Sequence, residues 1–127
     1  MPFPIEDFFL TRSIPNATDA VNQTIFSAPF DCKLVSVRTR HKTASTSGTM
    51  DLVTTVDAAT VAAGTSLLTT PMSNSGTADT DVDGSLLTTI AGLTIPKGSS
   101  LGLKFAGTLT NLVNLDITIR LRQLRKF

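Results

Sequence analysis

The sequence has few of the residues that build disulfide staples, metal sites and stacking platforms. It contains one cysteine, Cys32, one histidine, His41, and no tryptophan or tyrosine. A single cysteine excludes an intramolecular disulfide and therefore a disulfide-stapled scaffold. One histidine is a poor basis for the metal cluster that a cupin-type enzyme needs. The missing indole and phenol rings count against recognition of bases or sugars by stacking.

Charge is also scarce, and it is balanced. The chain has 11 basic and 10 acidic residues, which give a formal net charge of +1. Without a field of one sign, neither nucleic acid nor an acidic membrane surface is an expected partner. No segment approaches the ~20 apolar residues of a membrane helix. The first ten residues lack the basic start and unbroken apolar run of a signal peptide. We expect a soluble protein that is made in the cytoplasm.

The strongest positive signal is strict alternation near the C-terminus, where Leu115, Ile117, Ile119 and Leu121 are separated by single polar residues. Successive side chains of a strand point to opposite faces, so this pattern predicts a sheet with one dry face. A chain of 127 residues is long enough to bury a core in one domain without disulfide or metal.

From residue 24 onward, strand and turn signals alternate at short intervals, as in all-β sandwiches and barrels. We predict an all-β fold, a single antiparallel β-sandwich of seven to eight strands that is jelly-roll-like and spans residues 24–127. Segments 44–48, 74–84 and 107–111 are rich in Ser, Thr, Gly and Asp and are predicted loops. A helical turn is expected at 58–63. The predicted strands are 23–28, 33–42, 49–57, 66–70, 85–93, 99–106 and 114–123.

Residues 1–23 have a different character, and we predict an extended N-terminal arm there. Pro2, Pro4 and Pro15 restrict φ and favour extended backbone around them, which disfavours a long helix. The arm is too apolar to remain in water, yet its prolines disfavour a central strand. It is expected either to cover its own sandwich or to reach a neighbouring subunit or larger assembly. The candidate anchors are Phe3, Ile5, Phe8, Phe9 and Leu10.

One motif suggests a metal site. Asp79, Asp81, Asp83 and Gly84 spell D-x-D-x-D-G, the opening of an EF-hand calcium loop. The twelfth position should be a bidentate glutamate, but here it is Ile90. The flanking segments are predicted strands rather than helices. We interpret the loop as an acidic, solvated turn, keep its three aspartates as a weak metal candidate, and predict no cofactor.

Other reactive side chains give little support for catalysis. His41 follows two arginines near the end of predicted strand 33–42, without a neighbouring carboxylate to orient it as a general base. We predict an exposed, polar histidine. In the same strand, Val35 and Val37 are expected on the core face. Cys32 is interpreted as a structural residue, and no serine lies in a G-x-S-x-G motif. No catalytic residue is predicted, and the chain is not expected to be an enzyme.

Two basic edges are candidate docking surfaces. The first contains Arg120, Arg122 and Arg125 at the C-terminus, and the second is formed by residues 38, 40 and 42. Such charges more often form a solvated strand face or deter aggregation between sheet edges. If an edge binds a partner, an acidic protein surface is the expected target.

Four segments carry a resemblance to a known family: 33–38 (KLVSVR), 61–68 (VAAGTSLL), 93–103 (LTIPKGSSLGL) and 115–122 (LDITIRLR). Across residues 32–122 their order resembles the capsid decoration, or cement, proteins of tailed bacteriophages. The resemblance implies a jelly-roll core and a homotrimer on the outer capsid surface, with the major capsid protein as partner. It also implies that residues 1–13 clamp the shell or a sister subunit.

These observations lead to the hypothesis of a structural virion protein that decorates and stabilises a capsid. Binding to a shell by surface area alone requires no catalytic site. Standard protein interfaces bury about 1,600 Å² in total, and several copies that bind together gain avidity. The alternative is a receptor- or carbohydrate-binding module of a head fibre or tail tip that uses the 74–84 loop. The absence of Trp and Tyr counts against it. Strand order and a possible exchange of arms between subunits stay open.

Overall fold

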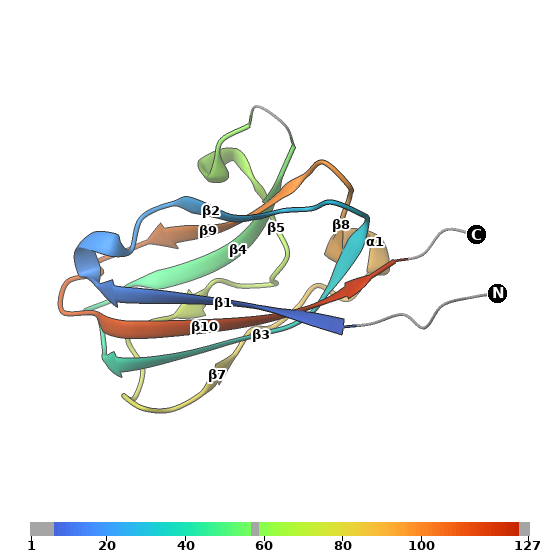
Figure 1. Cartoon of the computed structure of the whole chain (residues 1–127). Helices are drawn as coiled ribbons and strands as arrows, with labels where there is room; N and C mark the ends of the chain where they lie inside the picture. The colour runs from blue at the N-terminus through green and yellow to red at the C-terminus, as the bar shows by residue number, and fades with distance from the viewer. Residues whose placement is uncertain (1–6, 57–58, 125–127) are drawn as a thin grey trace.

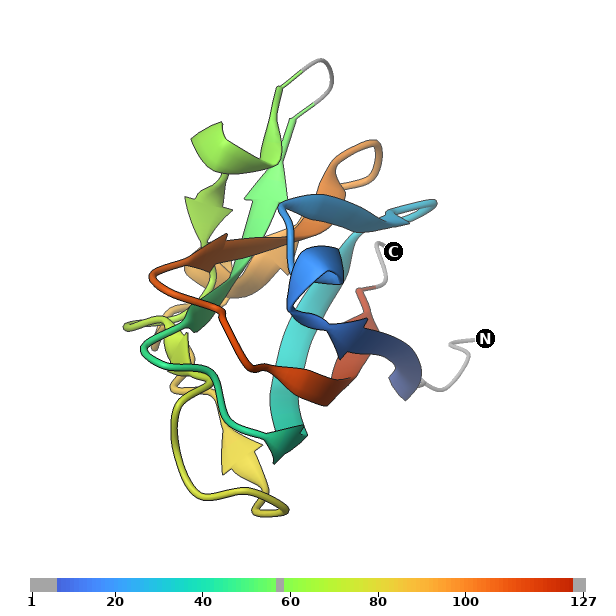
Figure 2. The ribbon, with the colours of Figure 1, turned by 90° about the vertical axis from the view of Figure 1, so that its left-hand side faces the viewer.

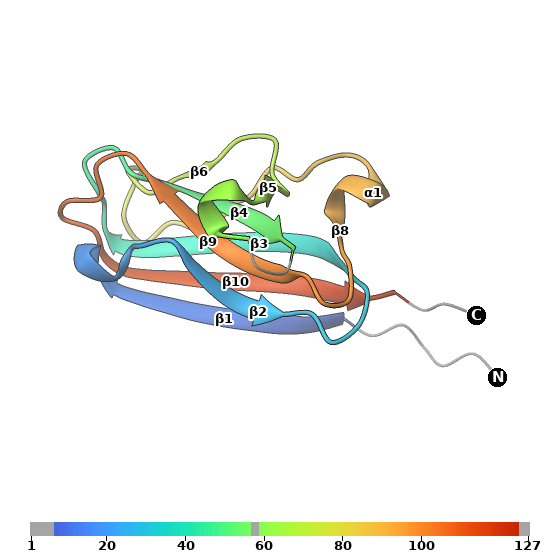
Figure 3. The same ribbon diagram turned by 90° about the horizontal axis from the view of Figure 1, so that it is seen from above.

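The computed structural model describes residues 7–56 and 59–124, and within them two five-stranded antiparallel sheets stack face to face (Figures 1 and 3). Sheet A has the order β1 (Asp7–Asn16), β10 (Val113–Gln123), β3 (Cys32–Thr43) and β7 (Val82–Asp83), and β8 (Thr94–Ile95) also pairs with β3. Sheet B has the order β2 (Gln23–Ser27), β9 (Ser100–Ala106), β4 (Thr49–Thr55) and β5 (Thr65–Ser66), and β6 (Met72–Ser73) also pairs with β4.

The strand order is that of a jelly roll. The chain crosses between the sheets from β1 to β2, from β2 to β3 and from β3 to β4, then from β6 to β7, and again near its end from β8 to β9 and from β9 to β10. Elements β5 and β6 pair with opposite ends of β4, while β7 and β8 pair with separate parts of β3. If each of these two pairs is one interrupted strand, the sandwich has the eight strands of a jelly roll. The predicted all-β, jelly-roll-like sandwich is confirmed.

The space between the sheets is filled by alternate residues of the long strands. Figure 2, turned by 90° from Figure 1, views the two sheets from one end of the sandwich. The four apolar residues of the C-terminal alternation are all buried, and they belong to one cluster with Leu52, Leu101 and Leu103 of sheet B. Full burial of an aliphatic side chain contributes about 1.5–3 kcal/mol. The alternation in β10 therefore contributes strongly to holding the sheets together.

Strand β3 changes its core-facing residues partway along. Its pairing with β10 is regular from Thr43 to Ser36 and then passes directly to Leu34, so Val35 is a bulged residue. Leu34 and Val37 are buried, and Val35 is half-buried. The prediction that Val35 shares the core face with Val37 is wrong, because the extra residue shifts the alternation by one.

Residues 7–16, which the sequence pattern assigned to the arm, form strand β1 at the edge of sheet A. Asp7 lies opposite Arg122, and Asn16 lies opposite Val113. Pro15 lies in this strand, and an edge is where a sheet tolerates proline. The sandwich therefore includes residues before 24. Only residues 1–6 of the predicted arm lie outside the described residues.

Short helical elements connect the strands: η1 (Ala17–Asp19), η2 (Val61–Ala63) and α1 (Ile90–Leu93). Gly64 ends η2, within the predicted helical turn. Element α1 replaces the end of predicted strand 85–93, because the Thr89 side chain accepts a hydrogen bond from the Gly92 N–H and caps the turn. In the described ranges, no helix combines the length and apolar character required to cross a membrane.

The turn after β9 generates a stability prediction. Gly107 has a φ of +77°, and a Cβ added there would lie 2.4 Å from the carbonyl oxygen of Ser47. Gly107→Ala is therefore expected to lower the free energy of unfolding by about 1–3 kcal/mol, through strained backbone and a clash with fixed backbone. Gly76→Ala is the matched control, because no atom lies within 4 Å of its added Cβ. Its change should stay within about 0.5 kcal/mol. Urea unfolding measures both, and equal losses would contradict this account of the turn.

Candidate interaction surface

The start of β1 and the end of β10 bring two predicted site groups together. Because the strands are antiparallel, Asp7 lies opposite Arg122 and Phe9 lies opposite Arg120. The Asp7 carboxylate forms ion pairs with Arg120 and with Arg122, the latter at 2.6 Å between Nε and Oδ1. Phe9 is 62% exposed, and the Arg120 guanidinium carbon lies 5.8 Å from the centroid of its ring. We call these four residues the corner surface.

Two of the predicted arm anchors belong to the interior of the protein. Phe8 and Leu10 are partly buried against the core cluster. The Phe8 ring centroid lies 5.8 Å from that of Phe26 and 5.6 Å from that of Phe30, in tilted and edge-on geometries. Aromatic pairs prefer such arrangements, which add about 0.5–1.5 kcal/mol to the area they bury. These side chains therefore hold β1 on its own sandwich.

The other predicted residues divide between the surface and the segments that the structure leaves out. Phe9 points to solvent on the outer face of sheet A. Phe3, Ile5 and Arg125 lie outside the described residues. Among the predicted anchors in the described part of the chain, Phe9 is the most exposed.

The electrostatics of the corner surface favour an ionised Asp7. The hydrogen bond from Arg122 is the largest cause of a pKa below the ordinary value of 3.8, and Arg120 adds its own hydrogen bond and charge. Partial burial acts in the opposite direction, since the Asp7 side chain is only 13% exposed. Charge-assisted hydrogen bonds are stronger than neutral ones. Asp7 therefore fastens the start of β1 to the end of β10.

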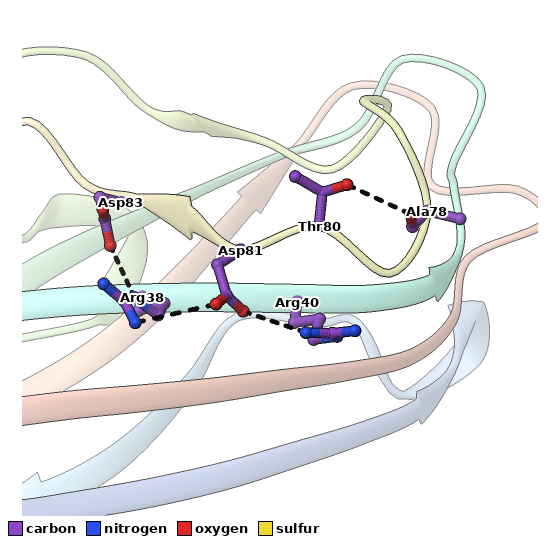
Figure 4. Close-up of polar contacts among 6 residues, drawn as sticks. All are labelled: Arg38, Arg40, Ala78, Thr80, Asp81 and Asp83. Atoms are coloured by element: carbon purple, nitrogen blue, oxygen red, sulfur yellow. Dashed lines mark hydrogen bonds and ion pairs between the residues drawn. The ribbon is translucent and has the colours of Figure 1, made fainter.

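Two carboxylates of the acidic loop, those of Asp81 and Asp83, point toward arginines of β3 (Figure 4). Strand β7 pairs with β3 and sets Asp83 opposite Arg38, whose Nε donates to Asp83 Oδ1 at 2.8 Å. Asp81 lies 3.8 Å from Arg38 and 3.6 Å from Arg40. Exposed ion pairs of this kind contribute little to stability, because water screens them. The second predicted basic edge is thus partly neutralised by the loop.

The weak metal candidate gains no support from this geometry. Across residues 7–56 and 59–124, no group of three or more histidine, cysteine or acidic side chains is placed to hold a metal ion. Asp79 has a φ of +57°, and its N–H donates to the carbonyl oxygen of His41 at 2.8 Å. The loop is therefore attached to β3 through both backbone and side chains.

The prediction of an exposed His41 is wrong, because the side chain is fully buried. Beyond the bulge, Val37, Thr39 and His41 occupy the core-facing positions of β3. The Nε2 atom lies 2.9 Å from the Gly76 carbonyl oxygen, and Nδ1 has no hydrogen-bond partner among the described residues. This contact adds the His41 side chain to the groups that attach the 74–84 loop to β3.

Cys32 is buried at the start of β3, where its Sγ lies 3.7 Å from the carbonyl oxygen of Ile95. Burial, followed by the charge of Asp31, raises the pKa of the thiol to about 11. The thiolate is the reactive form of cysteine and is rare at neutral pH when the pKa is this high. The environment agrees with a structural role.

One polar contact was not predicted from the sequence. Arg12 occupies a core-facing register position of β1, opposite Ile117, at the open flank between the two sheets. Its Nε and Nη2 donate to the Gln23 Oε1 at 3.2 and 2.8 Å. An inward-pointing charge on an edge strand is a known device against pairing with other edges. The alternation of Phe8, Leu10, Arg12 and Ile14 could have indicated it.

Comparisons with known proteins give a limited result. No family model matches the sequence, and no curated protein matches it. Among solved structures, a chain described as "Cyanophage Pam1 capsid asymmetric unit" is similar, with a TM-score of 0.49 and 10% sequence identity. The similarity covers 94% of this chain and 85% of that chain. At this TM-score and identity the likeness carries no argument about the fold or the function of this chain.

The corner surface generates a prediction about pH. The folded-state pKa of Asp7 is lowered, so its stabilising contribution is fully present above the unfolded-state value and is lost as pH falls below 3.8 through the folded-state pKa. The stability difference between wild type and Asp7→Asn should be constant from about pH 5 to 7 and shrink below that window. Urea unfolding between pH 2.5 and pH 7 measures it. Arg122→Gln should weaken the same pH dependence, and an unchanged profile in both variants would refute the assignment.

Proposed function

We propose that the protein is a structural virion protein that decorates and stabilises a bacteriophage capsid. It acts as a homotrimer without catalysis and binds the outer surface of the shell formed by the major capsid protein. The resemblance of four segments to decoration proteins supports this proposal, and those segments are distributed over both sheets. Segments 33–38 and 115–122 lie on the neighbouring strands β3 and β10. Segments 61–68 and 93–103 include η2, β5, β8 and most of β9.

The corner surface is the observation that carries the proposal. A phenylalanine that is 62% exposed beside two arginines has the composition of a protein-binding surface rather than of an ordinary solvated face. Two arginines against one aspartate leave the corner surface with a charge of +1. An acidic patch on a protein partner would complement it. Since β1 is the last strand of sheet A, a large partner can approach this edge.

The structure also defines which residues a test can change safely. Deleting residues 1–12 would remove Phe8 and Leu10 from the core as well as the exposed ring, because both contact the core cluster. Phe9 and Arg120 lie on the outer face, so substituting them leaves the interior intact. Val21 is 55% exposed and lies outside the corner surface, so it provides a matched control.

The double variant Phe9→Ser, Arg120→Ser is expected to bind capsid shells at least about tenfold more weakly than wild type, because such pairs act as hot spots. Co-sedimentation with shells of the major capsid protein from the same genome measures the affinity, and circular dichroism checks that the variant is folded. Val21→Ser should bind like wild type. Full binding by the folded double variant would show that the corner surface is not the contact.

A further inference from the structure

The two ends of the acidic loop are fixed to the sandwich by contacts without a titratable group. The Asn74 N–H donates to the Gly48 carbonyl oxygen, and the Gly84 N–H donates to that of Val37, both at 2.9 Å. Beside the second end, Val82 is partly buried against the core cluster. Because none of these groups changes its charge with pH, the two ends should stay in place in mild acid.

The middle of the loop, residues 76–81, is attached to β3 chiefly through one histidine. The Gly76 carbonyl oxygen lies 2.9 Å from Nε2 of His41, and the Asp79 N–H donates to the His41 carbonyl oxygen at 2.8 Å. The other polar contacts that the structure shows between this segment and β3 are the ion pairs of Asp81 with two arginines (Figure 4). These pairs are exposed and contribute little, because water screens them.

The contact with Gly76 fixes which nitrogen of the imidazole carries the proton. A carbonyl oxygen only accepts hydrogen bonds, so Nε2 of His41 is the donor and the neutral ring has its lone pair on Nδ1. The Nδ1 atom is buried and has no hydrogen-bond partner among the described residues. A second proton would bind there and would place a positive charge in the interior of the protein.

No carboxylate pairs with the imidazole in the part of the chain that the structure describes. Its neighbours along β3 are two cations, Arg40 and Lys42. Strand β10 contributes Asp116, which lies opposite Arg40, and the loop contributes Asp79 and Asp81. Apart from Asp81, these charged residues line one surface pocket of about 230 Å³. A charge on the ring would therefore have cations as its nearest neighbours in sequence.

The other elements around the histidine do not bring a counter-ion to it. The Asp83 carboxylate of β7 is paired with Arg38, and both side chains are exposed. Sheet B turns apolar residues to the interior, and its opposed charges, Asp51 and Lys104, alternate with these on the outer face.

An unpaired charge is costly to bury, so a charged ring favours conformations in which it reaches water. The buried polar atoms of Thr39 and Asn74 that lack a partner among the described residues are uncharged and do not offset this cost. Residues 76–81 contact the ring, and they are held less firmly than the two ends of the loop. They are therefore the segment that moves to admit water.

We propose that residues 76–81 are a pH-dependent cover on the basic edge of β3, and that protonation of His41 releases them. Strand β7 stays paired with β3, so only the middle of the loop opens. The proposal does not depend on the capsid role, because it concerns the isolated chain.

Release of the cover changes the charge that the edge presents. In the closed loop, Arg40 and Lys42 lie near the carboxylates of Asp79, Asp81 and Asp116. Once the loop opens, only Asp116 remains beside them. The exposed cations then complement an acidic protein surface, for which the loop is the internal substitute at neutral pH.

Nuclear magnetic resonance tests the release directly, because the chain has one histidine and its ring signals are unambiguous. Full-length wild type is titrated from pH 8 to pH 5, the range in which histidines ordinarily change charge. At pH 8 the ring nitrogen shifts should show the Nε2–H tautomer. As the ring becomes charged, the Asp79 amide should lose about tenfold or more of its protection from exchange, after correction for the intrinsic effect of pH. The Asn74 and Gly84 amides should keep theirs.

Two results would overturn the inference: a ring that stays neutral down to pH 5, or a charged ring with a protected Asp79 amide. His41→Gln retains a neutral donor for Gly76 and cannot become charged, so its Asp79 amide should stay protected at pH 5. Circular dichroism checks the fold of this buried substitution. The wild-type titration decides the question by itself where the variant does not fold.

A peptide of six glutamates is the probe for the exposed edge, and its side chains stay mostly ionised at pH 5.5. Wild type should bind it at least about fivefold more tightly at pH 5.5 than at pH 8, measured by calorimetry. Asp81→Asn weakens the cover and should bind the peptide more tightly than wild type at pH 8. Asp19→Asn removes the same charge from an exposed position in η1 and should bind like wild type. Equal affinities of the two variants, or no gain by wild type in acid, would refute the cover.

Discussion

The structure depends on the exclusion of water between two sheets, and β10 is the strand on which this exclusion depends most. It lies between β1 and β3 in sheet A, and its core-facing residues from Leu115 to Leu121 are all buried. Because β10 pairs on both sides, its register fixes the position of β1 and of the bulge in β3. The position of β1 and the position of the bulge then decide which side chains of these strands reach the surface.

The register of β1 connects the core to the candidate interaction surface. Once Phe8 and Leu10 occupy the interior, the alternation of a strand sends Phe9 outward, where Arg120 lies opposite. The same register sets Asp7 against Arg122. The corner surface is therefore a geometric result of packing the N-terminal strand, and it needs no separate folding unit.

The long strands could be predicted from sequence because each shows its own local alternation. Strands β2, β3, β4, β9 and β10 all lie within two residues of the predicted bounds. Strand β1 could not be recognised so easily, because its partner β10 lies more than a hundred residues away and Arg12 interrupts its apolar pattern. The same difficulty applies to β7 and β8, which are two residues long and exist only through pairing with β3.

The candidate site was predictable in composition but not in geometry. The sequence identified Phe9, Arg120 and Arg122 as members of two separate groups, and only the antiparallel register shows that they adjoin. The wrong prediction that His41 is exposed relied on the cationic residues beside it in the sequence. Its alternation with Arg38 and Arg40 already placed it on the face of Val37, which the structure buries. Residue pattern was the better guide there than local charge.

The position of β1 within sheet A is the central claim, and amide hydrogen exchange followed by mass spectrometry tests it most directly. Amides that bond across strands exchange only when the pairing opens. The account predicts that peptides covering residues 7–16 contain protected amides, with protection comparable to that of peptides covering β10. Exchange of the whole 7–16 segment at the rate of an unstructured peptide, with β10 still protected, would contradict it.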